Sequence, residues 1–106
     1  MKVLLDNNIP IAIRKLLGKH HVFTSAYMGW THLQNGDLLA AAEAGGFDVM
    51  LTADQNLSYQ QSLAKRKIAL VVLGTPRWSI LSEHVPKIVA AVDAAKSKPY
   101  EFLDFP

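Results

Sequence analysis

Short apolar runs alternate with longer stretches of mixed character along the chain. The runs lie at Val3–Leu5, Val22–Phe23, Val49–Leu51 and Ile68–Leu73. They are too short for helices, and the longest are rich in β-branched residues, as strands buried on both faces are. The pattern therefore predicts four buried strands.

Helix signals fill the intervening stretches. Helices are predicted from Asn8 to about Gly18, from Asp37 to Ala44, from Asn56 or Ser58 to the basic cluster Lys65–Lys67, and from Ser79 to Lys96. Asn8 and Asp37 are favoured capping residues, and Gly45-Gly46 suits a helix end. Pro86 should interrupt the last helix near its start.

This alternation of strand and helix predicts an α/β fold. We expect a three-layer α/β/α arrangement around a mostly parallel sheet of four to five strands. The segment 98–106 holds two phenylalanines, a tyrosine and a leucine between prolines, which suits either an added edge strand or a tail that docks on a partner. With 106 residues, half of them apolar, the chain should form one domain over 1–106.

Composition narrows the classes of function. A formal net charge of +2 permits nucleic-acid binding without requiring it. The lack of cysteine excludes disulfides, thiolate zinc sites and a cysteine nucleophile. Because the first apolar run reaches Asp6 too soon for a signal peptide and no run approaches membrane-spanning length, we expect a cytoplasmic protein without membrane contact.

Aspartates stand at three ends of apolar or helical segments. Asp6 follows the first apolar run, Asp54 follows the third, and Asp37 precedes the second helix. In a parallel sheet such positions share the carboxyl edge, where converging carboxylates become tolerable only through protonation or a hard cation. We therefore expect Asp6, Asp37 and Asp54 to bind Mg²⁺ or Mn²⁺ and to support phosphodiester hydrolysis.

Other polar residues near these turns can serve either the metal site or the local backbone. Thr52 can place a hydroxyl beside the metal, and the amides of Asn7 and Asn56 can ligate weakly or simply bond the local backbone. For Asp37 alone, a helix cap is the simpler interpretation.

Basic and aromatic residues suggest contacts with RNA. Arg14, Lys15 and Arg77 can meet phosphates, whereas Lys65–Lys67 is better explained as a complement to a helix dipole. Trp30 can either stack on a base or close the edge of the core.

At these residues the chain resembles a known family. The segments Leu4-Leu5-Asp6-Asn7-Asn8-Ile9-Pro10 and Leu51-Thr52-Ala53-Asp54-Gln55-Asn56-Leu57, with Asp37 between them, look like the small PIN-like proteins of bacteria, relatives of the PIN-domain ribonuclease toxins. The resemblance implies a parallel sheet, an acidic Mg²⁺ or Mn²⁺ site formed by Asp6, Asp37 and Asp54, RNA as substrate, and a cognate antitoxin as partner.

The chain departs from the family pattern at two positions. Asn7 stands where the family usually has Glu, and Asn56 where it usually has a second Asp. Each change removes a carboxylate, which lowers the attraction for a divalent ion.

Three functions remain open from the sequence. The first is a metal-dependent ribonuclease, the toxin of a toxin–antitoxin pair. The second is a catalytically degenerate module that binds an antitoxin or itself as a homo-oligomer. The third is a receiver-like phosphoacceptor, which is disfavoured because paired acids after the first strand are lacking.

Overall fold

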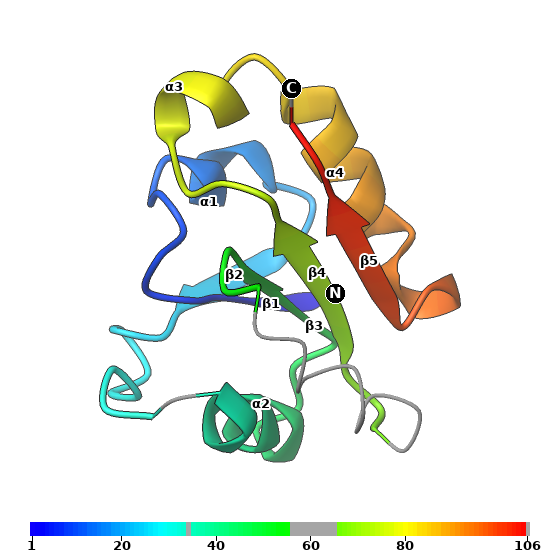
Figure 1. The fold of residues 1–106 in the computed structure, drawn as a ribbon. Coiled ribbons are helices and arrows are strands. Elements are labelled where there is room, and N and C mark those ends of the chain that lie inside the picture. Colours follow the sequence, from blue (N-terminus) through cyan, green and yellow to red (C-terminus); the bar gives the residue numbers. More distant parts are fainter. Residues whose placement is uncertain (34, 56–65, 106) are drawn as a thin grey trace.

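A five-stranded sheet forms the centre of the protein, and all of its strands run parallel (Figure 1). The computed structural model describes residues 1–33, 35–55 and 66–105. The strands are β1 (Lys2–Leu5), β2 (His21–Thr24), β3 (Val49–Thr52), β4 (Ala69–Leu73) and β5 (Tyr100–Leu103), in the spatial order β2-β1-β3-β4-β5. The four predicted strands are thus confirmed, and the terminal segment adds the fifth at one edge.

Helices cover both faces of the sheet (Figure 1). On one face, α2 (Asn35–Ala44) packs Leu38 and Leu39 against Leu4 and Met50. The other face is covered by α1 (Ile13–Leu16), α3 (Trp78–Leu81) and α4 (Val85–Asp93). Residues of these helices share a core with Val3, Leu5 and other strand residues on that face. Because neighbouring strand residues point to opposite faces, both apolar layers come from the same short runs. The expected α/β/α layering is confirmed.

The first helix is shorter than predicted. It spans Ile13–Leu16, its N-cap is Ala12, and no side chain caps it. The prediction that Asn8 caps this helix is wrong, because the Asn8 Oδ1 accepts a hydrogen bond from the Ala53 backbone N–H at 3.0 Å. Asn8 therefore joins the ends of β1 and β3 instead of starting a helix.

Helix α2 begins at Asn35, so Asp37 lies inside its first turn and does not precede it. Its carboxylate there complements the positive end of the helix dipole. The predicted end at the glycine pair is confirmed: the Gly46 N–H donates to the Glu43 carbonyl at 3.1 Å and the Phe47 N–H to the Ala42 carbonyl at 3.0 Å. These two bonds form a Schellman motif, and Gly46 supplies the required positive φ of 81°.

The predicted interruption of the Ser79–Lys96 segment near Pro86 is confirmed, and it divides the segment into separate elements. The chain forms α3, then α4, then a 3₁₀ turn η3 (Ala95–Ser97). The break precedes Pro86, which cannot donate to the carbonyl four residues earlier and clashes with it. The helix predicted from Asn56 or Ser58 falls largely outside the described residues. Within the described part of the chain, no helix has the length and apolar character needed to cross a bilayer.

Candidate acidic site at the carboxyl edge of the sheet

The strand order creates a topological switch between β1 and β3. From β1 the chain moves outward to β2, and it later returns to form β3 on the opposite side of β1. The loops that leave β1 and β3 therefore diverge, and such a divergence at the carboxyl ends of parallel strands is the usual place of a ligand-binding crevice. Asp6 follows β1 directly, and Asp54 follows β3 by two residues. Both are half-buried.

Thr52 links the two acidic residues. Its side chain is fully buried, and its hydroxyl donates to the Asp6 Oδ2 at 2.7 Å. The Thr52 Oγ1 also accepts a hydrogen bond from the Asp54 backbone N–H at 3.0 Å. Because a hydroxyl has one proton and two acceptor positions, it can make both bonds at once. Thr52 thus fixes the direction of the Asp6 carboxylate and the start of the loop that carries Asp54.

Further hydrogen bonds extend this network to β2. The Asn7 backbone N–H donates to the Asp6 Oδ1 at 2.7 Å, and the Asn7 Oδ1 accepts from the Ser25 hydroxyl at 2.6 Å. Ser25 is fully buried and follows β2 directly. Sequence reasoning missed Ser25, although a serine at the end of a strand-like run was the available signal. With its amide oxygen bonded to Ser25, Asn7 fits the turn-bonding interpretation.

The loops after β3 and β4 also meet at this edge. The Gln55 Nε2 donates to the Gly74 carbonyl at 3.1 Å. Arg77 is exposed and lies beyond Gly74, as the N-cap of α3. It is therefore on the carboxyl side of the sheet, as expected of a phosphate contact.

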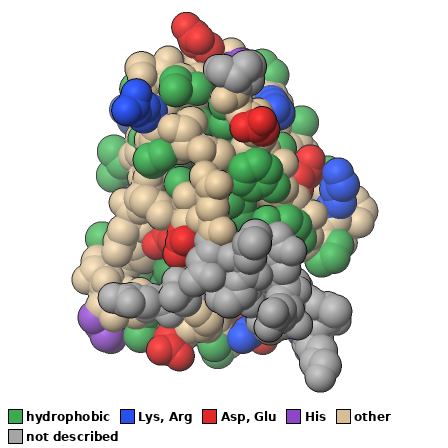
Figure 2. Space-filling model, in the orientation of Figure 1, with side chains coloured by type: hydrophobic (Ala, Val, Ile, Leu, Met, Phe, Trp, Pro, Cys, Tyr) green, Lys and Arg blue, Asp and Glu red, His purple; other side chains and the backbone are tan. Residues whose placement is uncertain are grey.

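The other basic candidates belong to α1. Arg14 and Lys15 are exposed in this helix, which connects β1 to β2. In Figure 2, acidic side chains lie at separate places over the face drawn there, and lysines and arginines are scattered among them.

The carboxylates suit a cation that is held mostly through water. Over residues 1–33, 35–55 and 66–105, no three His, Asp or Glu side chains lie close enough to hold one metal ion, so Asp37 does not join Asp6 and Asp54 in such a group. Mg²⁺ often takes only one or two carboxylates and keeps its waters. Each Asp6 oxygen has one hydrogen-bond donor among the contacts above and can accept another. The Asp6 carboxylate therefore has the acceptor capacity that one protein ligand of such an ion needs.

The remaining predicted site residues lie in different parts of the protein. Asp37 is exposed in α2, and Asn56 lies outside the described residues. Trp30 packs on Phe47 with ring centroids 5.9 Å apart and borders the core, which confirms its interpretation as an edge plug. Trp78, in contrast, is 38% exposed.

Comparisons with protein-family models, with curated proteins and with solved structures each found no significant match. The likeness to the PIN-like proteins therefore rests on the residues of the sequence.

Proposed function

We propose that this protein is a Mg²⁺- or Mn²⁺-dependent ribonuclease of the PIN-like type, acting in the cytoplasm as the toxin of a toxin–antitoxin pair. The observation that carries the proposal is the bonding of Asp6 and Asp54 to one buried threonine at the β1/β3 switch. Two acidic residues at a topological switch point, both bonded to one buried hydroxyl, suit metal-assisted attack on a phosphodiester better than they suit a purely structural role.

Each residue has a defined task in this proposal. Asp6 and Asp54 would hold the metal, which supplies an activated water and neutralises phosphate charge. Thr52 keeps the Asp6 carboxylate in one orientation through its 2.7 Å hydrogen bond. Arg77 would attract the RNA phosphates from the loop beyond β4, with Arg14 and Lys15 contributing from α1.

The test is cleavage of single-stranded RNA with Mn²⁺ or Mg²⁺ added. Asp6→Asn and Asp54→Asn should each lower the rate by at least about 100-fold, because even residues that only support metal ligands change activity by about 10- to 100-fold. Asp37→Asn should cost less, since Asp37 joins no group of three acids in the described residues. Glu83→Gln, at an exposed position between α3 and α4, is the matched control and should keep full activity.

Unchanged cleavage in both Asp6→Asn and Asp54→Asn would refute the nuclease proposal. So would the absence of Mn²⁺ binding to the unaltered protein.

A second candidate function is a catalytically degenerate module that binds an antitoxin or a second copy of itself. It is favoured by Asn7, whose amide replaces a carboxylate and is bonded to Ser25, and by exposed Trp78 and Phe102. Deleting the residues after Pro99 cannot test it cleanly, because β5 belongs to the sheet. Trp78→Ser and Phe102→Ser are better probes: under this alternative, the mass in solution measured by light scattering should fall with either change.

A further inference from the structure

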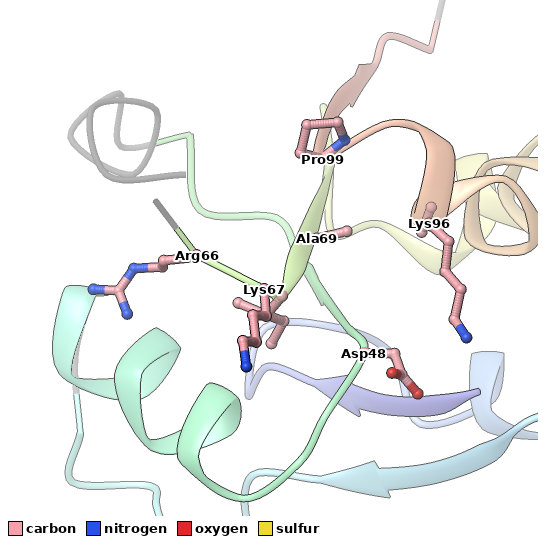
Figure 3. A pocket seen from close by; sticks show the side chains of 8 residues that line it. Asp48, Arg66, Lys67, Ala69, Lys96 and Pro99 are labelled. Atoms are coloured by element: carbon pink, nitrogen blue, oxygen red, sulfur yellow. The ribbon is translucent and has the colours of Figure 1, made fainter. Parts of the chain in front are cut away.

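A pocket of about 460 Å³ opens at the amino edge of the sheet, opposite the acidic site (Figure 3). Its apolar wall is formed by Ile68, Ala69 and Ala95, all of them buried. Lys67, Lys96 and Asp48 bring charge to its rim. Asp48 directly precedes β3, whereas Asp54 follows it, so four strand residues, or about 13 Å, separate the two edges.

Two lysines of this pocket have no acidic partner in the part of the chain that the structure describes. Lys67 precedes β4 and Lys96 belongs to η3, and in Figure 3 they extend on either side of Asp48. Among the described residues, no carboxylate oxygen lies within 4.0 Å of either ammonium group.

The neighbouring charges are accounted for differently. Arg66 points away toward α2, where its Nη1 lies 3.4 Å from the Glu43 Oε1. The other Glu43 oxygen accepts the Lys67 backbone N–H at 2.6 Å, which anchors the chain at the start of β4. Glu43 thus offsets Arg66, and the charges of Lys67 and Lys96 remain at the pocket.

Asp48 adds a hydrogen-bond acceptor between the lysines. Its Oδ2 accepts the Lys2 backbone N–H at 2.8 Å, which fixes the carboxylate at the rim. Its Oδ1 accepts no hydrogen bond from the described part of the chain. A ligand that reaches both lysines therefore meets a fixed acceptor beside them, which favours hydroxyl donors close to its anionic group.

We propose that this pocket binds a small phosphate ester that carries hydroxyl groups, with the phosphate between Lys67 and Lys96 and a hydroxyl donating to Asp48. Lysine is a common point-charge partner of phosphate, and a dianion matches two ammonium groups. The volume lies within the range of about 300 to 1,000 Å³ typical of small-ligand pockets. This site is independent of the ribonuclease proposal, because the two share no residue.

The test is an NMR titration of the ¹⁵N-labelled full chain with ribose 5-phosphate, inorganic phosphate and ribose. Ribose 5-phosphate should cause saturable shifts at the amides of Lys67, Ala69 and Lys96 and should bind more tightly than either other probe. Lys96→Gln and Lys67→Gln should each weaken it about tenfold, as the loss of one charge-assisted hydrogen bond does. Lys19→Gln removes an exposed charge outside the pocket and should change the affinity less than about twofold.

Asp48→Asn separates recognition of the hydroxyl from attraction of the charge. It removes a negative charge and keeps an acceptor for the Lys2 backbone N–H. Inorganic phosphate should therefore bind more tightly, and the ratio of its dissociation constant to that of ribose 5-phosphate should decrease. The proposal is overturned if shifts appear only around Asp6, if Lys19→Gln and Lys96→Gln weaken binding equally, or if ribose 5-phosphate binds no better than inorganic phosphate.

Discussion

Thr52 carries no charge, yet its hydroxyl is bonded to both acidic residues of the candidate site, to the Asp6 carboxylate and to the Asp54 backbone N–H. Thr52→Val keeps the shape and removes the hydroxyl, which leaves the Asp54 N–H without its acceptor. We expect a loss of about 1 to 3 kcal/mol in the free energy of unfolding, measured by urea titration. Thr52→Ser keeps the hydroxyl and loses one buried methyl, so it should lose only about 1 kcal/mol. Equal losses in the two variants would contradict the role assigned to the hydroxyl.

Single residues also show where sequence reasoning ends. Asp6, Thr52 and Asp54 could be assigned to one sheet edge because they terminate strand-like runs. The bonds from Ser25 to Asn7 and from Ala53 to Asn8 join residues 18 and 45 positions apart. They depend on which strands are neighbours, and an apolar pattern does not contain that information.

At the scale of the element, the end of α2 is fixed by one glycine. Gly46 has a φ of 81°, and the Schellman bonds require this conformation. Gly46→Ala should destabilise the protein by about 1 to 2 kcal/mol, because a Cβ strains the left-handed region. Gly36→Ala, in the first turn of the same helix, meets no atom within 4 Å and should be neutral or stabilising by up to about 1 kcal/mol. Thermal unfolding of both variants checks the pair, and a neutral Gly46→Ala would contradict the motif.

Strand β5 provides a second comparison within one element. Leu103 is 4% exposed and belongs to the core, whereas the adjacent Phe102 is 43% exposed. Leu103→Ala should lower the free energy of unfolding by about 2 to 5 kcal/mol. Phe102→Ala should change the free energy of unfolding by less than about 1 kcal/mol, since much of the Phe102 surface is in water in the folded protein. If Phe102→Ala proved the more damaging change, β5 would not sit in the sheet as described.

Elements differed in how well the sequence predicted them. The strands were predicted closely because continuous apolar runs are typical of parallel strands. The limits of the first helix were not, since the Asn8 side chain bonds a distant backbone group instead of capping that helix. The break near Pro86 was predicted, because proline is a local signal in the sequence.

For the whole molecule, a bound cation should stabilise the fold. At 100 times its dissociation constant, a ligand of the native state adds about 2.7 kcal/mol. For a chain of 106 residues this raises Tm by roughly 10 °C. We expect Mn²⁺ to produce such a shift in the unaltered protein and in Glu83→Gln, and to produce little in Asp6→Asn. The same shift in Asp6→Asn would place the ion elsewhere.

The sequence predicted the α/β class of the fold, but it did not predict the spatial order of the strands. Alternating strand and helix segments lead to a parallel sheet with both faces covered. The order β2-β1-β3-β4-β5, which brings Asp6 beside Thr52, is a property of the assembled sheet. Because this arrangement cannot be deduced from the sequence, Asp37 was predicted to cluster with Asp6 and Asp54. The described residues contain no such group of three acids.

The hydrogen bond between Thr52 and Asp6 closes a separation of 46 residues. During translation, the ribosome therefore releases the carboxylate well before the hydroxyl that orients it. A nascent chain that ends before β3 cannot hold the Asp6 carboxylate in this orientation, so the candidate site forms only after β3 has left the exit tunnel.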